Sequence, residues 1–139
     1  MKRDEQEGRG TRRILVVDDE PPVLNLITGI LRTAGFQVLG VSETRLVMDR
    51  VREFRPHLVL TDLDMPGLDG SEICILLKSL PETAAIPIVF LSGRTLDADH
   101  DLGLFSGASA YLDKPVSSND LVRTVRSVLG QGVARKADR

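Results

Sequence analysis

Apolar residues gather in five short runs along the chain, and stretches with helical spacing separate them. The runs lie at residues 13–17, 36–41, 58–61, 86–91 and 108–112. Each run is apolar at consecutive positions, which is typical of a strand buried between helices. Between the runs, apolar residues recur three and four positions apart, which predicts helices at residues 21–34, 43–54, 71–80, 96–106 and 120–129. Strict alternation of strand and helix predicts an α/β protein with a doubly wound, five-stranded parallel sheet and five helices.

The ends of the chain lack this pattern. Residues 1–12 and 130–139 are polar and carry no apolar periodicity, so we expect a disordered N-terminal tail and a C-terminal tail or start of a linker. The 139 residues, 42% of them hydrophobic, are enough for one domain with its own core, which we place at residues 13–129. We expect Ser117 or Ser118 to cap the last helix, with Asp120 completing a capping box.

Chemically active side chains stand where the predicted strands end. Asp18 and Asp19 follow the first strand, Asp62 the third, Ser92 the fourth and Lys114 the fifth. An open parallel sheet binds its ligands at the carboxyl ends of its strands, so these residues meet if the first and third strands are neighbours.

Three converging carboxylates raise one another's pKa unless a cation lies between them. A hard divalent ion such as Mg²⁺ takes oxygen ligands and pairs with phosphate oxygens. A carboxylate, here Asp62, can act as the nucleophile in phosphoryl transfer. Lys114, the Ser92 hydroxyl and backbone amides near Asp64 would then hold the phosphoryl oxygens.

Composition narrows the remaining classes of function. A net charge of −2 gives no general attraction to nucleic acid or anionic lipid, and Trp is absent. No apolar run approaches the ~20 residues of a membrane span, and the start of the chain does not have the pattern of a secretory signal. The single cysteine, Cys74, lies in an apolar run and is interpreted as a buried small residue in a reducing compartment. We therefore expect a soluble cytoplasmic domain without a membrane partner.

Four segments of the chain resemble the receiver domains of two-component response regulators. They are Leu15–Glu20, Thr61–Gly70, Phe90–Gly93 and Gly107–Pro115, in the family's order and spacing. The resemblance covers residue 13 to about residue 129. It implies a flavodoxin-like (βα)5 fold with strand order 2-1-3-4-5, as in CheY.

The resemblance also implies a role for each matching residue. Asp62 is the phosphoacceptor, with Ser92 and Lys114 contacting the phosphoryl group. Asp18, Asp19, Asp62 and the backbone carbonyl of Asp64 are the expected Mg²⁺ ligands, Asp18 through water. Ser92 and Tyr111 are the expected switch residues, and the Lys114–Pro115 bond is expected to be cis. Asp64 also stands at a variable position that tunes the lifetime of the phosphoryl group.

The implied partners are a sensor histidine kinase or phosphotransfer protein and a downstream protein or C-terminal output domain. The implied activity is that of a signalling switch that promotes only its own phosphorylation and dephosphorylation, not that of an enzyme. No helix-turn-helix lies in these residues, so direct contact with nucleic acid is not expected. The implied assembly is a monomer or a phosphorylation-dependent dimer.

Two other classes of function compete. Asp62 and Asp64 resemble the Asp-x-Asp of haloacid-dehalogenase-type phosphatases, in which the second acid is the acid/base. That motif belongs on the first strand of its domain, however, and a Thr is expected where Pro66 stands. A flavodoxin-type cofactor binder would need a phosphate loop after the first strand, where this chain has acids.

Each candidate residue also has an ordinary structural explanation. Asp18 and Asp19 are good helix N-cap residues, Asp62 and Ser92 suit turns, Lys114 suits a solvated position and Tyr111 suits a core rim. All of them except Tyr111 fall at strand ends along one sheet edge, which separate structural explanations do not account for. The two histidines, His57 and His100, are too far apart to suggest a metal site and are interpreted as structural and solvated, respectively.

Overall fold

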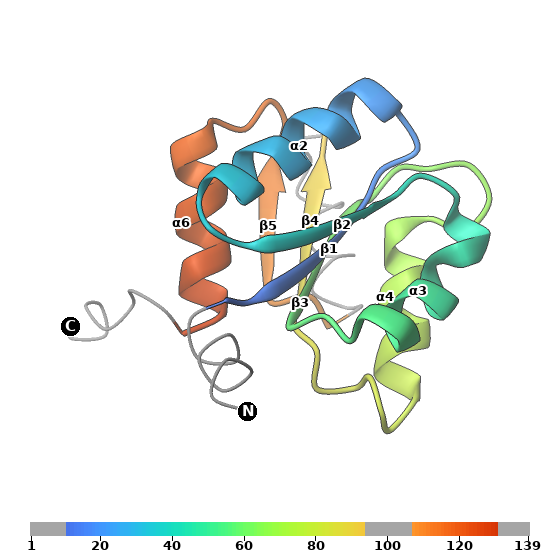
Figure 1. Cartoon of the computed structure of the whole chain (residues 1–139). Coiled ribbons are helices and arrows are strands. Elements are labelled where there is room, and N and C mark those ends of the chain that lie inside the picture. The colour runs from blue at the N-terminus through green and yellow to red at the C-terminus, as the bar shows by residue number, and fades with distance from the viewer. Residues whose placement is uncertain (1–10, 94–106, 131–139) are drawn as a thin grey trace.

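A computed structural model describes residues 11–93 and 107–130. Its centre is a five-stranded parallel sheet with the order β2-β1-β3-β4-β5, as predicted (Figure 1). The strands are β1 (Arg13–Val17), β2 (Gln37–Val41), β3 (Leu58–Asp62), β4 (Ile88–Ser92) and β5 (Ala110–Asp113). The register places Val17 opposite Thr61 and Asp62 opposite Leu91, so β1, β3 and β4 end close to one another.

Helices cover both faces of this sheet. They are α2 (Pro21–Thr33), α3 (Val47–Phe54), α4 (Gly70–Ser79) and α6 (Ser118–Val128), and a short 3₁₀ turn, η1 (Thr44–Leu46), precedes α3. In Figure 1, α2 and α6 lie on one side of the sheet and α3 and α4 on the other. The helix predicted at residues 96–106 lies outside the described residues.

The core is divided by the sheet into two layers. Side chains of β1 alternate, so that Ile14 and Val16 pack with α2 and α6, whereas Leu15 and Val17 pack with α3 and α4. Each β1 residue from position 14 to 17 is buried, which explains the unbroken apolar run in the sequence. Among the described helices, none is both long and apolar enough to cross a membrane.

Several predicted element limits were wrong by a few residues. Phe36 precedes β2 and closes the end of α2, because its N–H donates to the carbonyl of Leu31 (3.1 Å) across Gly35, whose φ is +103°. The fourth strand begins after Pro87, which has no N–H to donate but accepts from the N–H of Val59 (3.0 Å).

The predicted second helix begins as a 3₁₀ turn. Regular α-helix starts at Val47 rather than at Glu43, and neither turn has a side-chain N-cap. The sequence there shows helical spacing but no capping residue that would mark the start.

The cap of α6 was predicted in part. The Ser117 hydroxyl accepts from the N–H of Asp120 (3.0 Å), as expected. The carboxylate of Asp120 accepts from Arg123 (2.9 Å) and not from the backbone N–H of Ser117, so the second hydrogen bond of the predicted capping box was wrong.

The edge of the sheet where the strands begin is held by Arg13 and His57. The N–H of Arg13 donates to Nδ1 of His57 (2.9 Å), and the N–H of His57 donates to the Arg13 carbonyl (2.8 Å). The Arg13 side chain donates to the carbonyls of Phe54 and Arg55, where α3 ends with Arg55 in the left-handed region. His57 therefore has the structural role that its position suggested.

Candidate functional site

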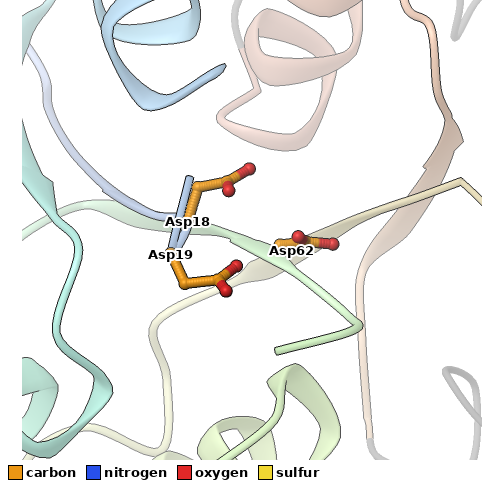
Figure 2. A group of neighbouring side chains, drawn as sticks. All are labelled: Asp18, Asp19 and Asp62. Atoms are coloured by element: carbon orange, nitrogen blue, oxygen red, sulfur yellow. The ribbon is translucent and has the colours of Figure 1, made fainter. Parts of the chain in front are cut away.

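Three acidic side chains meet at the carboxyl edge of the sheet. Asp18 and Asp19 directly follow β1, and Asp62 is the last residue of the neighbouring β3. One carboxylate oxygen from each lies within 4.8 Å of the others, and Figure 2 shows the three side chains near one another at the ends of their strands. Asp18 is fully buried and Asp62 is 5% exposed. The predicted meeting of these acids depended on β1 and β3 being neighbours, and they are.

Backbone contacts hold Asp18 in place at the end of β1. Its N–H donates to the carbonyl of Val41 (3.1 Å), which extends the pairing of β1 with β2 by one step. Its Oδ1 accepts from the N–H of Glu20 (2.9 Å) just before α2 begins. The N-cap of α2 is Glu20 itself, without a side-chain cap, so the alternative interpretation of Asp18 and Asp19 as the caps is wrong.

Lys114 brings the cationic group of the site. Its Nζ lies 3.4 Å from Oδ2 of Asp18 and 3.3 Å from Oδ2 of Asp62. The Lys114 N–H donates to the Ser92 carbonyl (2.7 Å), which continues the pairing of β5 with β4. The Lys114–Pro115 bond is cis, as the resemblance implied. Lys114 thus reaches across β4 to the two acids.

The charges at this edge are only partly balanced. Burial raises the pKa of Asp62 and Asp18 adds to this effect, while Lys114 and the Asp64 N–H oppose it; the pKa remains raised. Burial lowers the pKa of Lys114, but the carboxylates of Asp62 and Asp18 outweigh it, so that pKa is raised. One ammonium group among three carboxylates leaves an excess of negative charge.

That donor set fits a divalent cation. All three candidate ligands are carboxylates, which are hard oxygen donors of the kind that Mg²⁺ binds. The single Lys114 ammonium does not balance the charge of three carboxylates, and a divalent cation would neutralise the excess negative charge.

Asp64 and Ser92 lie beside Asp62. The N–H of Asp64 donates to Oδ1 of Asp62 (3.2 Å). The hydroxyl of Ser92, the last residue of β4 and fully buried, donates to Oδ2 of Asp64 at 3.5 Å. The sequence analysis gave Asp64 a backbone ligand role and a position that tunes the phosphoryl lifetime, but it did not predict this contact with Ser92, which joins residues 28 positions apart.

Tyr111 lies outside the acidic cluster. It pairs with Phe90 across β4 and β5, two positions before Ser92 pairs with Asp113. The Tyr111 and Phe90 rings meet edge to face, with centroids 6.3 Å apart and planes at 89°. Tyr111 is therefore near the end of β4, and its ring packs with the core layer that contains α3 and α4.

A doubly wound parallel sheet with buried acids and a lysine at its carboxyl edge defines a class of α/β proteins that bind cations and anionic groups at their strand ends. Within that class, the profile of the response regulator receiver domain matches residues 14–126. The chain belongs to this family, so the resemblance seen in the sequence is confirmed.

Individual relatives agree with this assignment. The DNA-binding response regulator MtrA of Mycolicibacterium smegmatis is 41% identical over 118 residues, which are 85% of this chain and 50% of MtrA. The chain thus spans about half the length of the curated relatives that it matches. It is a phospho-accepting receiver of the two-component type, a class of signalling switch, and the phosphatase alternative finds no support among these proteins.

Solved structures share the fold. The BeF3-activated N-terminal receiver domain of RstA from Klebsiella pneumoniae is 31% identical, with a TM-score of 0.79 over 86% of this chain and 99% of that one. The receiver domain of the sensor histidine kinase PA1611 from Pseudomonas aeruginosa is 26% identical, with a TM-score of 0.79 over 87% and 99%. That receiver is described with a magnesium ion coordinated in its active site cleft.

Proposed function

We propose that Asp62 accepts a phosphoryl group from a histidine kinase or phosphotransfer protein in a Mg²⁺-dependent reaction. The observation that carries this proposal is the position of the Asp62 carboxylate. It lies at the end of β3 with the carboxylates of Asp18 and Asp19 within 4.8 Å and the Lys114 ammonium at 3.3 Å. At the end of β3 these groups supply a nucleophile, a site for a cation and an ammonium group that can pair with the anionic phosphoryl oxygens.

The metal would be held by the carboxylates of Asp18, Asp19 and Asp62, with the backbone carbonyl of Asp64 as a further ligand. When bound, Mg²⁺ supplies positive charge against the oxygens of the transferred group. Supporting this assignment, the receiver of PA1611 is described with a magnesium ion coordinated in its active site cleft.

Phosphoryl transfer would use the chain's own residues as follows. A carboxylate oxygen of Asp62 attacks phosphorus, the bond from phosphorus to the donor imidazole nitrogen breaks, and that nitrogen keeps the electron pair. Lys114 then pairs with a phosphoryl oxygen in place of the Asp62 carboxylate oxygen that it contacts in the unphosphorylated protein. The Ser92 hydroxyl leaves Asp64 and donates to another phosphoryl oxygen.

The movement of Ser92 would be the start of the switch. Tyr111 follows it inward, because its ring lies on the strand next to Ser92 and packs against Phe90. The altered surface would then bias an equilibrium between two states of the domain. This surface acts on a downstream protein or on an output domain, and this chain itself contacts no nucleic acid.

We further propose that the receiver unit spans residues 13–129, with flanking tails, and works in the cytoplasm. Its only reactions are its own phosphorylation and dephosphorylation. It acts as a monomer or as a dimer formed on phosphorylation. The name of MtrA describes that relative as DNA-binding, which is consistent with an output function carried outside this receiver.

The test is incubation with acetyl phosphate and Mg²⁺, followed by intact-mass measurement. We expect wild type to gain one phosphoryl group, and the Asp62→Asn variant or wild type with EDTA to gain none. Asp69→Asn is the matched control, because it neutralises an acid of the same loop while an Asn still caps α4. An unmodified wild type, or an adduct that survives Asp62→Asn, would contradict the proposal.

A further inference from the structure

The first turn of α4 lies directly against the end of β3. A Cβ placed on Gly70 would collide with the carbonyl oxygen of Asp62, and it would stand 2.9 Å from the Cα of Leu63 and 3.2 Å from the carbonyl carbon of Asp62. Both contacting residues present backbone atoms, which cannot turn aside as a flexible side chain can. Among the described glycines, only Gly70 has a Cβ position closer than 3.0 Å to another atom.

Hydrogen bonds hold the two segments together at this point. The N–H of Gly70 donates to the carbonyl of Leu63 (3.1 Å), and the N–H of Leu63 donates to the carbonyl of Leu91 in β4 (2.8 Å). The chain therefore leaves the sheet at Leu63 and returns to the same place at Gly70. Residues 64–69 form a loop closed at its base by this contact, which we call the loop neck.

Hydrogen bonds also hold the start of α4 in place. The Asp69 carboxylate accepts from the N–H of Glu72 (3.0 Å), and the Glu72 carboxylate accepts from the N–H of Asp69 (2.9 Å). The Ser71 hydroxyl also donates to Asp69 (2.9 Å). A complete capping box thus holds Gly70 against the Asp62 carbonyl.

From this geometry we infer that Gly70 is a positioning residue for the acidic site. The close approach of α4 sets the position of the Asp62 backbone and the course of the chain into Asp64. Asp62 then offers its carboxylate, and Asp64 its N–H, in one arrangement beside Asp18 and Asp19. The inference rests on the proposed function, because it concerns how the same site holds its cation.

The first experiment compares Gly70→Ala with Gly29→Ala. Gly29 lies in α2 with nothing within 4 Å of its Cβ position, so the same methyl group is added there without a contact. We expect Gly70→Ala to weaken Mg²⁺ binding by the unphosphorylated protein about tenfold, the size of effect seen when supporting contacts of metal ligands are lost. Gly29→Ala should bind Mg²⁺ like wild type. A folded Gly70→Ala protein with wild-type affinity would overturn the inference.

The second experiment loosens the loop neck without adding an atom, and it applies even if Gly70→Ala does not fold. Glu72→Ala removes the bond to the Asp69 N–H, whereas Glu72→Gln keeps an acceptor there; both remove the same charge. We expect Glu72→Ala to bind Mg²⁺ about threefold more weakly than Glu72→Gln, which is the size of effect that the loss of one hydrogen bond produces. Equal affinities would contradict a positioning role of the neck.

Amide chemical shifts separate this inference from the proposed function. If wild type itself fails to bind Mg²⁺ or to accept phosphate, the proposed function is wrong. The positions of Asp62 and Asp64 can still be compared by NMR without metal. Gly70→Ala should shift both amides and Gly29→Ala neither. A loss of stability in Gly70→Ala with unchanged shifts at Asp62 and Asp64 would mean a merely structural glycine and would overturn the inference.

Discussion

The Asp62 carboxylate is held in the folded protein at a cost in free energy when no cation is bound. Burial, together with the charge of Asp18, raises its pKa despite the nearby Lys114. A raised pKa in the folded state means that the carboxyl group loses its proton more easily in the unfolded chain. At neutral pH, where the group is ionised, this difference lowers the free energy of unfolding.

Asp62→Asn should therefore stabilise the metal-free protein, because the variant buries no carboxylate charge at this position. Urea unfolding in EDTA at neutral pH measures the change. Mg²⁺ should raise the unfolding midpoint of wild type more than that of Asp62→Asn, because the variant lacks one of the three acids. A variant that is less stable than wild type in EDTA would contradict this interpretation of the charge balance.

His57 makes the free energy of unfolding depend on pH in the opposite direction to Asp62. Burial lowers its pKa from the ordinary value of 6.5, and the charges of Arg13 and Arg12 lower it further. The Arg13 N–H also needs an unprotonated Nδ1 as its acceptor. Below pH 6.5 the unfolded chain binds a proton that the folded chain resists, so the contribution of His57 is complete above 6.5 and is lost as the pH falls.

We expect the free energy of unfolding to decline from about pH 7.5 toward about pH 5.5. His57→Gln should reduce that slope, because a Gln side chain can accept from Arg13 without titrating. Chemical denaturation at several pH values measures both slopes. The same slope in both proteins would assign the decline to other groups.

Residues at strand ends were the easiest to predict from the sequence. Asp18, Asp62, Ser92 and Lys114 each follow an apolar run, and parallel strands bring such positions to one edge. The contact of Ser92 with Asp64 and the close approach of Gly70 were missed. Both depend on distances between backbone segments after packing, for which a linear pattern holds no signal.

At the scale of elements, α6 depends on one capping side chain. Ser117 accepts from the N–H of Asp120, one of the helix N–H groups that has no partner inside the helix. Ser117→Ala should cost about 1 kcal/mol in the free energy of unfolding. Ser118→Ala, at the next and also exposed position, should change it by much less. Urea unfolding compares the two, and equal losses would mean that the Ser117 hydroxyl is not the cap.

Whether the start of a helix could be predicted depended on whether the sequence has a capping residue there. Ser117 stands directly before its helix, and that cap was expected. The capping box of Asp69 and Glu72 was overlooked, although its Asp-x-x-Glu spacing is readable in the sequence. The start of α3 could not have been read in this way, because Glu43 and Leu46 precede their turns without any capping bond.

At the scale of the whole molecule, Cys74 reports on the opening of the core. It is fully buried in α4 and packs in the layer between the sheet, α3 and α4. Burial raises the pKa of its thiol, so little thiolate exists at neutral pH. Alkylation by iodoacetamide should be slow in the native protein and should accelerate in urea together with the loss of circular dichroism. Rapid alkylation under native conditions would show that this layer opens without global unfolding.

The order of the strands was the part of the architecture that alternation alone left open. Strands that alternate with helices along the chain predict a parallel sheet, but several strand orders are compatible with this alternation. The order came from the resemblance carried by four short segments, and the sheet confirms it. The acidic cluster depends on that order, because β1 and β3 are separated in the sequence by β2.

The parallel sheet also separates the site from the described ends of the chain. Every strand finishes at the acidic edge, whereas β1 starts and α6 finishes near the opposite edge (Figure 1). A dye or a carrier protein joined near Thr11 or Gly130 would thus sit away from the three acids. Surface immobilisation through either point would leave the three acids facing the solution, which makes the domain convenient for binding measurements on a sensor chip.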